Sequence, residues 1–436
     1  MSDRRVAPAT RVNARVAVPG DKSISHRALI IGSLASGRSY IGGLSPAADV
    51  AATARCLRDC GAWVRDFGRG RVAIDGAGPG ASLQTPDGPL DCANSGTTMR
   101  LLAGALAGHD AHAALDGDSS LQRRPMARVA EPLRAMGAVV ETSAAGTAPL
   151  RVDGRRVLRP IEWTPQVPSA QVKSAVLLAA LSADGPTTLH EGAPTRDHTE
   201  RLLRMCGVDV SSDSGGSIRL TPGEVAPFGY RVPGDISSAA FFLCVAAARP
   251  GWRVRATRIG INPTRTGILD VLRSMGAAID VDAANDDATE PCGDIEVRGA
   301  SLHATSIAGA LTVRCIDELP VLAVLATQAE GETQVFDAAE LRAKESDRIA
   351  EVVAGLRAFG AECEATPDGF VVNGPVRLRA TRIDAHGDHR LAMAWAIAAA
   401  LAGEGSGDSV IEGSEAAAVS YPSFFEDLDA ALSGSG

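Results

Sequence analysis

A short phrase, Leu-Arg-x-x-Gly followed by a small or apolar residue, recurs five times along this chain of 436 residues. Each phrase is typical of the end of an amphipathic helix, followed by a left-handed glycine and then a strand. The glycines lie 69 to 84 residues apart, at Gly61, Gly137, Gly207, Gly276 and Gly360. A repeat of this length predicts that one supersecondary unit is used several times over.

A second set of features alternates with these phrases. Six strongly apolar helices are expected, each opening with polar or glycine-rich residues, and they begin near Asp21, Asn94, Ser169, Gly234, Asp317 and Gly387. Beyond the first turn they are apolar on nearly every face, which predicts that they are buried. Several of them stop at a glycine and lead into a β-type segment.

The unit is therefore about 70 residues long, with two helices and several strands, and six units fit the chain. The last one ends in the helical segment SYPSFFEDLDAAL without the glycine phrase, as expected for a terminal unit. A chain of this length exceeds one compact core, so we expect an α/β (α+β) protein with two domains of three pseudo-symmetric units each.

The domain boundary is expected at 230–234, where the phrase Val-Pro-Gly-Asp occurs for the second time. Its first occurrence, at 18–21, indicates that the chain crosses between the domains twice. We therefore expect one domain over residues 20–232 and the other over residues 1–19 plus 233–436.

Composition limits the possible functions. The net charge is −9, from 43 basic and 52 acidic residues, which disfavours a nucleic-acid or anionic-membrane binder. Aromatic residues make up only 4% of the chain, which disfavours base stacking. The N-terminal segment 1–18 has no apolar core of signal-peptide length, and no run of about 18 apolar residues lacks charges or breakers, so a cytoplasmic protein is expected.

The eight cysteines include no CxxC pair. Cys56 and Cys60, four residues apart on an expected helix, are interpreted as small core residues rather than metal ligands or disulfide partners. The sequence signals neither a metal site nor an organic cofactor.

Charged and hydroxyl residues gather at the starts of the expected helices, where free backbone N–H groups and the helix dipole favour anions. Lys22, Ser23, His26 and Arg27 surround the first start. The others fall in segments 94–100, 122–126, 169–173, 195–200, 317–318, 341–348 and 388–390. A local positive site for phosphates and carboxylates is thus predicted, although Arg124 could equally lie in solvent and 341–348 could be a salt-bridged surface helix.

Seven segments taken together carry a family resemblance. They are GDKSISHRALI, NSGTTMRLL, LQRRPM, SAQVKSA, TRDHTERLL, LRAKESDRI and GDHRLAMA, in this order. From about residue 12 to residue 430 the chain resembles the 5-enolpyruvylshikimate-3-phosphate synthase family. The resemblance implies the enolpyruvyl-transferase fold, with three βαββαβ units in each domain and the active site in the cleft between the domains.

The resemblance also implies a reaction. The enolpyruvyl group of phosphoenolpyruvate is transferred to the 5-hydroxyl of shikimate 3-phosphate by addition and elimination, in the pathway to chorismate and the aromatic amino acids. Shikimate 3-phosphate is expected to contact Lys22, Ser23, Arg27, Ser169, Ala170, Gln171, Arg196, Asp317 and Lys344. Phosphoenolpyruvate is expected to contact Lys22, Gly96, Arg124, Gln171, Arg348 and Arg390. The acid/base candidates are Asp317, Glu345 and Lys22, with their individual roles left open.

Four positions depart from the pattern of some family members. Val419 stands where those members have a lysine, and Glu340 where they have an asparagine. Ala170 replaces a second serine, and Arg196 also replaces a serine. These changes resemble a bacterial branch of the family, so activity is still expected, without a cofactor and in a monomer.

Two alternatives remain. One is the sister transferase that acts on UDP-N-acetylglucosamine, which typically begins with a Lys-Asn pair and uses a loop cysteine. Here Ser23 follows Lys22, and segment 122–124 contains no cysteine. The other is a non-catalytic anion-binding protein on the same scaffold, against which the combination of Asp317, Lys344 and Glu345 argues.

Overall fold

A computed structural model describes residues 3–76, 83–284 and 289–433 of the chain. The chain divides into two compact units, Gly20–Val232 and Met1–Pro19 together with Pro233–Gly436. We refer to them as the middle unit and the terminal unit. Each unit has its own continuous core of buried aliphatic side chains.

The middle unit contains three helices that are buried on almost all sides and three that bury one face. The buried helices are α1 (Lys22–Leu34), α3 (Gly96–Ala107) and α5 (Ala170–Ala180). The amphipathic helices are α2 (Ala48–Asp59), α4 (Ala127–Ala135) and α6 (His198–Met205). A short 3₁₀ segment, η1 (Leu121–Arg123), precedes α4.

Three four-stranded sheets complete the middle unit, in the orders β14-β3-β5-β4, β6-β7-β9-β8 and β10-β11-β13-β12. In each sheet the first pair is parallel and the other two pairs are antiparallel. The strands are β3 (Arg38–Gly42), β4 (Trp63–Asp66), β5 (Val72–Asp75), β6 (Leu90–Asp91), β7 (His112–Asp116), β8 (Val139–Glu141), β9 (Leu150–Asp153), β10 (Glu162–Trp163), β11 (Thr187–His190), β12 (Val210–Ser212), β13 (Ser217–Leu220) and β14 (Gly229–Arg231).

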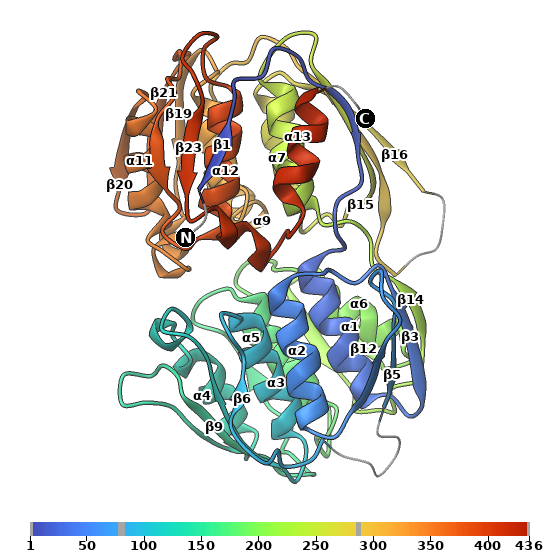
Figure 1. The fold of residues 1–436 in the computed structure, drawn as a ribbon. Coiled ribbons are helices and arrows are strands. Elements are labelled where there is room, and N and C mark those ends of the chain that lie inside the picture. The colour runs from blue at the N-terminus through green and yellow to red at the C-terminus, as the bar shows by residue number, and fades with distance from the viewer. Residues whose placement is uncertain (1–2, 77–82, 285–288, 434–436) are drawn as a thin grey trace. The chain divides into compact units, whose positions relative to one another are not determined.

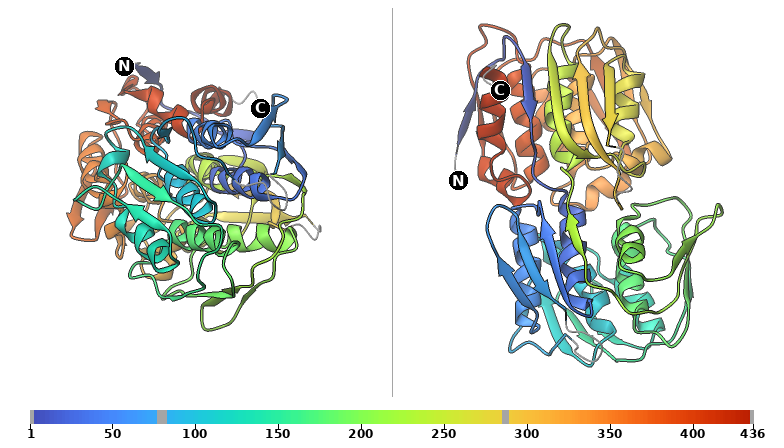
Figure 2. Two further views of the ribbon diagram at one scale, coloured as in Figure 1. Left: turned by 90° about the horizontal axis from the view of Figure 1, so that it is seen from below. Right: turned by 90° about the vertical axis from the view of Figure 1, so that its right-hand side faces the viewer.

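The terminal unit repeats this plan. Its buried helices are α7 (Ile236–Ala247), α10 (Leu319–Ala326) and α12 (His389–Ala400). The others are α8 (Gly267–Ser274), α9 (Ala310–Arg314), α11 (Arg348–Ala358) and α13 (Phe424–Ser433), with 3₁₀ segments η2 (Ala339–Ala343) and η3 (Ser414–Val419). Figures 1 and 2 show that within each unit the buried helices lie side by side and the sheets lie outside them.

The sheets of the terminal unit have the orders β16-β17-β15-β2, β18-β19-β21-β20 and β1-β23-β22. Their strands are β1 (Arg4–Val6), β2 (Asn13–Val16), β15 (Arg253–Gly260), β16 (Ala278–Ala283), β17 (Cys292–Arg298), β18 (Ser306–Ile307), β19 (Gly331–Val335), β20 (Glu362–Thr366), β21 (Gly369–Gly374), β22 (Arg382–Asp384) and β23 (Ser409–Glu412). The N-terminal strands β1 and β2 thus complete two sheets of this unit, β1 antiparallel to β23 and β2 parallel to β15.

The fold class expected from the sequence is confirmed, with one difference inside the repeat. In the middle unit the chain order is β-α-β-α-β-β, as in β6-α3-β7-α4-β8-β9, rather than βαββαβ. A single strand separates the two helices of a repeat. The second helix is followed by an antiparallel hairpin, because adjacent antiparallel strands need only a short turn whereas parallel strands need a crossover.

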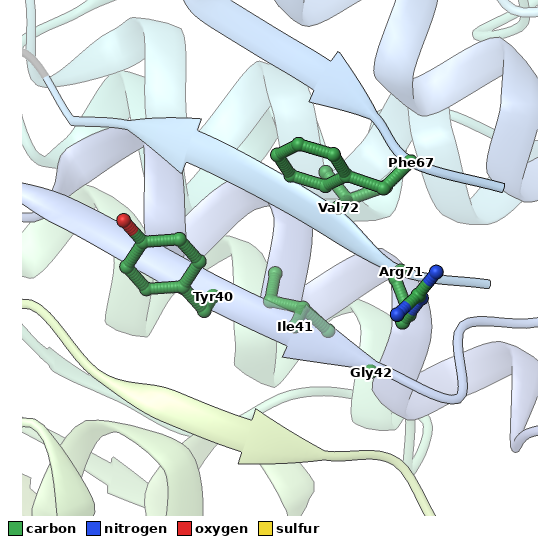
Figure 3. A pocket seen from close by; sticks show the side chains of 6 residues that line it. All are labelled: Tyr40, Ile41, Gly42, Phe67, Arg71 and Val72. Carbon is green, nitrogen blue, oxygen red and sulfur yellow. The ribbon is translucent and has the colours of Figure 1, made fainter.

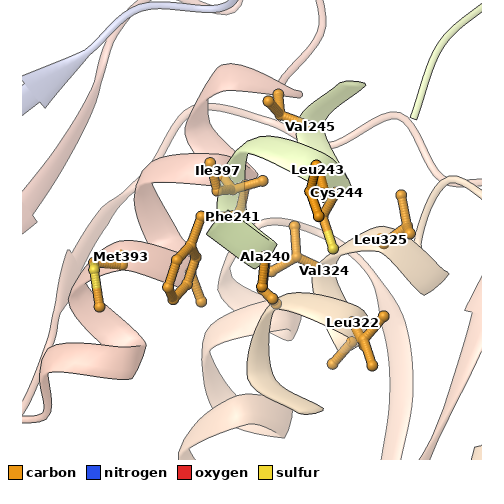
Figure 4. Packing of buried hydrophobic residues seen from close by; sticks show 14 of the residues in the cluster. Ala240, Phe241, Leu243, Cys244, Val245, Leu322, Val324, Leu325, Met393 and Ile397 are labelled. Atoms are coloured by element: carbon orange, nitrogen blue, oxygen red, sulfur yellow. The ribbon is translucent and has the colours of Figure 1, made fainter. Parts of the chain in front are cut away.

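The core of the terminal unit shows why the buried helices must be apolar all round. All twelve residues of α7 and all twelve of α12 are buried. Phe241 of α7, Val324 of α10 and Met393 of α12 belong to one cluster, where the three helices pack together (Figure 4). Burying each such side chain contributes roughly 1.5–3 kcal/mol. All eight cysteines are buried, and Cys56 and Cys60 belong to the core of the middle unit, as expected.

The recurring phrase has a structural explanation. Its five glycines all have positive φ, between 84° and 100°, where a side chain is disfavoured. The arginine of the phrase donates from Nε to a backbone carbonyl six residues later in four repeats. The bonds run from Arg58 to Val64 (3.2 Å), Arg134 to Val140 (2.5 Å), Arg204 to Val210 (2.6 Å) and Arg357 to Cys363 (3.0 Å).

The accepting residues lie on β4, β8, β12 and β20, which are edge strands. Each arginine therefore ties its helix to the strand that follows and satisfies a carbonyl that the sheet leaves open. In the remaining repeat, Arg273 donates instead to Asp270 Oδ1 on its own helix, at 3.4 Å.

We predict that Arg204→Met lowers the free energy of unfolding by about 1 kcal/mol, because the Val210 carbonyl loses a charged donor. The matched control is Arg273→Met, which removes an exposed arginine without such a bond. Differential scanning calorimetry should show a drop of roughly 2–4 °C for Arg204→Met and a smaller one for the control. Equal shifts in both variants would contradict this role.

Candidate functional site

The N-terminal ends of the three buried helices gather in the middle unit. Each is capped by a side chain. Asp21 Oδ1 accepts from Ile24 N (2.9 Å), Ser95 Oγ from Thr98 N (3.1 Å) and Ser169 Oγ from Val172 N (3.4 Å). These caps lie within one residue of the predicted helix starts, because capping is a local interaction.

Arg27 joins three helices at this end. Its side chain is buried, and Nε donates to Thr199 Oγ1 of α6 at 2.8 Å. The Nη atoms donate to Ser174 Oγ of α5 at 2.7 Å and to the carbonyl of Ser23 at 2.8 Å. These bonds fix the plane of the guanidinium group, which is the condition for directional recognition of a carboxylate or phosphate.

Lys22 and Arg196 lie beside this arginine. Lys22 Nζ is 3.0 Å from Asp49 Oδ2 of α2, and its side chain is only 17% exposed. Arg196, just before α6, places Nη1 3.5 Å from Ser23 Oγ. The structure therefore brings Lys22, Ser23, Arg27 and Arg196 together, and a carboxylate that the sequence did not single out, Asp49, orients the lysine.

A second set of predicted residues meets at the starts of α3 and α5. Gln171 Nε2 donates to Thr97 Oγ1 at 2.9 Å, and Gln171 Oε1 accepts from Arg100 Nη1 at 2.5 Å. A Cβ atom on Gly96 would lie 2.9 Å from Arg100 Nη1 and 3.3 Å from Arg124 Nη1. A side chain at this position would displace the guanidinium group of Arg100, so glycine lets both arginines lie close to the backbone of the helix start.

The chain has only three lysines, Lys22, Lys173 and Lys344, among its 43 basic residues. Lysine is a compact charge that arginine does not replace at a close contact. Lys173 belongs to the predicted helix start 169–173, and its Nζ is buried between Glu191 Oε2 (2.9 Å) and Glu200 Oε1 (2.7 Å). It therefore fixes the segment that leads to Arg196 and is not exposed to a ligand.

A chain of buried hydroxyls connects α1 to α3. His26 Nδ1 is 2.6 Å from Thr53 Oγ1, Thr53 Oγ1 is 2.7 Å from Thr98 Oγ1, and Thr98 Oγ1 donates to Ser95 Oγ at 2.7 Å. Complete burial lowers the pKa of His26 well below its ordinary value, and the charges of Lys22 and Arg27 lower it further. A neutral imidazole at this position adds no charge to the cationic site.

The terminal unit gathers its own three helix starts, with acidic residues at all three caps. Asp235 Oδ1 accepts from Ser237 N and Asp388 Oδ1 from Arg390 N, both at 2.9 Å. Glu318, at the start of α10, accepts a hydrogen bond from Ser237 Oγ. Burial raises the pKa of Glu318, although Arg265 opposes this effect.

The guanidinium group of Arg348 is held by two carboxylates near these helix starts. Nε and Nη2 contact the two oxygens of Asp388 at 2.8 and 3.1 Å, and Nη2 also contacts Glu345 Oε2 at 2.6 Å. Its side chain is 2% exposed. Burial disfavours the charged form, but Asp388 and Glu345 outweigh it and raise the pKa of Arg348 above its usual value. The segment 341–348 is thus no simple surface helix.

Asp317 lies among three cations. Its Oδ1 is 3.8 Å from Arg348 Nη1 and 3.9 Å from Lys344 Nζ, and its Oδ2 is 3.9 Å from Arg265 Nη1. Its side chain is 18% exposed. These three distances are longer than hydrogen bonds, so the surrounding cations act on the carboxylate through longer-range electrostatic attraction.

Ser237 connects the rest of the cluster. Its Oγ accepts from Arg265 Nη2 at 2.7 Å, and its carbonyl accepts from Arg390 Nη1 at 3.1 Å. Arg265 also contacts Asp235 Oδ1 at 3.2 Å. Arg265 was not among the predicted site residues, although it follows an Asn-Pro pair directly before α8, a helix start like those that hold the predicted residues.

The predicted site residues therefore form two groups, one in each unit. The middle unit holds Lys22, Ser23, Arg27, Gly96, Arg124, Ser169, Ala170, Gln171 and Arg196, and the terminal unit holds Asp317, Lys344, Glu345, Arg348 and Arg390. Val419, where some relatives have lysine, ends η3, a segment that packs against α12. Glu340, another departure, lies 3.6 Å from Lys344 Nζ through its Oε1.

Metal-binding clusters and membrane-spanning helices are both absent from the described residues. Among the described residues, no group of three His, Cys, Asp or Glu side chains is placed to hold a metal ion. No helix in the described part of the chain has both the length and the apolar character that a membrane crossing requires.

Comparison with known proteins gives one consistent result. The family model described as EPSP synthase (3-phosphoshikimate 1-carboxyvinyltransferase) matches residues 6–428. A 3-phosphoshikimate 1-carboxyvinyltransferase from Synechococcus sp. (strain WH7803) is 50% identical over 95% of this chain and 94% of its own. One from Geobacillus kaustophilus is 49% identical over 96% of this chain and 97% of its own.

Solved structures agree. An EPSP synthase from Acinetobacter baumannii superposes with a TM-score of 0.87 at 39% identity, covering 99% of this chain and 98% of that one. The enolpyruvyl transferase NikO from Streptomyces tendae has a TM-score of 0.75 at 18% identity, covering 98% of this chain and 96% of that one. The second likeness concerns the fold alone.

We predict that Lys173→Met lowers the free energy of unfolding by about 3–5 kcal/mol, because it leaves Glu191 and Glu200 buried without their cation. Lys22→Met is the matched control. Its pair with Asp49 is more exposed, so the loss should stay below about 1 kcal/mol. Thermal unfolding of both variants checks this, and similar losses would show that Lys173 is not the structural lysine.

His26 gives a prediction about pH. Its folded pKa lies below the unfolded value of about 6.5, so as pH falls below 6.5 the unfolded chain takes up a proton that the folded chain does not. This histidine therefore reduces stability at low pH, by up to about 1.4 kcal/mol per pH unit. His26→Gln should lose less stability than the parent between pH 7 and 5.5 in urea unfolding. A parent His26 resonance that titrates near pH 6.5 by NMR would contradict it.

Proposed function

Because this chain belongs to the EPSP synthase (3-phosphoshikimate 1-carboxyvinyltransferase) family, we propose a division of its reaction between the two residue groups. The enzyme is a transferase that moves the enolpyruvyl group of phosphoenolpyruvate to the 5-hydroxyl of shikimate 3-phosphate and releases phosphate. The observation that carries the proposal is that two of the three helix starts in the middle unit are capped by serine hydroxyls, whereas acidic residues occupy all three starts in the terminal unit.

The middle unit mainly binds shikimate 3-phosphate. A phosphate carries a charge of about −1.5 to −2 and the substrate adds a carboxylate, so strong positive charge is needed. Lys22, Ser23, Arg27 and Arg196 supply a charged and hydroxyl-rich surface for it. Ser169, Ala170 and Gln171 add a helix start whose cap is a neutral hydroxyl, which leaves the dipole available to an anion. Asp317 and Lys344 of the terminal unit hold ring hydroxyls.

Phosphoenolpyruvate is bound by arginines from both groups. Arg124 lies beside the backbone of Gly96, while Gln171 is fixed by Thr97 and Arg100. Arg348 and Arg390 in the terminal unit, together with Lys22, supply the remaining charge. Bidentate contacts of arginine with carboxylate and phosphate fix the orientation of the reacting carbon atoms.

The acid and base come from the terminal unit. Addition requires removal of the 5-hydroxyl proton and protonation of the methylene carbon, and elimination then reverses the second transfer. The three cations around Asp317 favour the carboxylate that a base needs. Glu345, whose Oε2 lies 2.6 Å from Arg348 Nη2, and Lys22 are the other groups that can exchange a proton with the substrates.

Two competing functions are less well supported. The relatives with about half of their residues identical are all shikimate 3-phosphate enzymes, which disfavours action on UDP-N-acetylglucosamine. A non-catalytic binder would not need Asp317 and Glu345 in contact with the same arginine, Arg348. We also propose that the enzyme acts as a monomer in the cytoplasm. Its eight buried free thiols suit a reducing compartment, and each unit has a core of its own.

Lys22→Met and Glu345→Ala should each lower turnover by roughly 10²–10⁴-fold, as expected for the loss of a proton-transfer group. Phosphate release from the two substrates measures this. Glu351→Ala, a carboxylate on the exposed side of α11 that pairs with His386, should retain the parent rate. Near-normal rates in both Lys22→Met and Glu345→Ala would contradict their assignment as proton-transfer groups. If the parent protein binds both ligands normally but releases no phosphate, the non-catalytic binder is favoured.

A further inference from the structure

Three aromatic side chains gather on the outer face of the first sheet of the middle unit. Tyr40 on β3, Trp63 on β4 and Phe67 just after β4 are 57%, 43% and 46% exposed. Within the described residues they are three of the four aromatic side chains exposed to this extent, in a chain with only 4% aromatic residues. Exposed rings gathered on one face are characteristic of binding surfaces.

A groove of 350 Å³ crosses this face (Figure 3). It is lined by Tyr40, Ile41, Gly42, Phe67, Arg71 and Val72. Its volume lies within the range of about 300–1,000 Å³ found for small-molecule sites. The rings of Tyr40 and Phe67 come from β3 and from the segment after β4, with β5 between them in the sheet, and Arg71 lies at one end, beside Gly42 (Figure 3).

The groove owes part of its depth to a glycine. Gly42 follows Tyr40 by two residues on β3, so both face outward, and it has no side chain to cover the sheet. A Cβ atom built on Gly42 meets nothing within 4 Å, and its φ is not positive, so no backbone constraint requires glycine there. Gly42 is the last residue of β3, and a glycine in a strand can mark close approach of a ligand.

The charged side chains on this face favour an anionic ligand. Arg38 is neutralised by Asp75 through two hydrogen bonds of 2.6 and 2.8 Å, and it stacks on Trp63 at 4.7 Å from the ring centroid. Arg65 stacks on Phe67 at 5.1 Å. Arg71 is exposed at the groove and forms no ion pair with the described residues. The groove thus has apolar walls, two aromatic rings and one uncompensated cation.

We propose that this groove binds a small aromatic carboxylate. A flat ring would lie between Tyr40 and Phe67 over the space left by Gly42, and its carboxylate would pair with Arg71 in a bidentate contact. The site is separate from the residues assigned to the transfer reaction and does not depend on those assignments. The carbonyl of Gly42 accepts a backbone hydrogen bond from Val232 N at 2.9 Å. Val232 is the last residue of the middle unit, so a ligand in the groove contacts a strand that is hydrogen-bonded to this chain segment.

The probe for the test is 3-phenylpropionate, with 3-phenylpropanamide as the uncharged match. Titration calorimetry and saturation-transfer NMR on the full chain should show saturable binding of the carboxylate with a Kd of about 1 mM or tighter. The amide should bind at least about 10-fold more weakly. Lack of saturable carboxylate binding up to about 20 mM, or equal affinity for the amide, would overturn the proposal.

Three variants locate the ligand. Gly42→Val fills the groove with a side chain suited to a strand, and Arg71→Gln removes the cation. Each should weaken 3-phenylpropionate binding at least about 10-fold, with unchanged thermal unfolding as the check on folding. Arg151→Gln, an exposed arginine on β9, is the control and should bind as the parent does. Parent-like affinity in Gly42→Val and Arg71→Gln would place the ligand elsewhere and refute the site.

A second copy of the chain is the competing occupant of this face. Sedimentation velocity of the parent and of Arg71→Gln distinguishes it. A parent dimer that dissociates in Arg71→Gln would assign the face to self-association and overturn the small-ligand proposal. A monomer in both, together with saturable carboxylate binding, supports it.

Discussion

The central constraint on this molecule is that each unit brings together the positive ends of three buried helices. The helices are apolar on almost every face, so only their first turns offer polar groups. Three unpaired sets of N–H groups and three aligned dipoles in one place are unfavourable unless negative charge or hydroxyl groups compensate them. Buried polar residues such as Ser95, Asp235 and Asp388 lie at these helix starts and provide that compensation.

The two units meet the same constraint with different chemistry. In the middle unit two of the three caps are serines, Ser95 and Ser169, so much of the positive potential is left for a ligand. In the terminal unit Asp235, Glu318 and Asp388 occupy the helix starts, and Arg265, Arg348 and Arg390 surround them. One architecture thus provides a surface suited to anions and a dense network of carboxylates and guanidinium groups.

Local features of this protein were predictable because they depend on neighbouring residues. The five glycines of the repeat have positive φ, and each buried helix starts within two residues of its predicted position. Partners distant in the sequence were not predictable. Nothing local to Lys22 indicates Asp49, and Lys173 resembled an exposed donor at a helix start until its burial between Glu191 and Glu200 became visible.

The sequence by itself determined the repeat, the sixfold use of one helix–strand plan and the residue types at each helix start. Periodicity and capping act over a few residues and are therefore written in the chain. Tertiary structure alone decided which lysine is structural, that the repeat arginines cover edge-strand carbonyls, and that Gly42 opens a groove between two exposed rings. These outcomes depend on contacts between segments far apart in sequence, which local patterns do not encode.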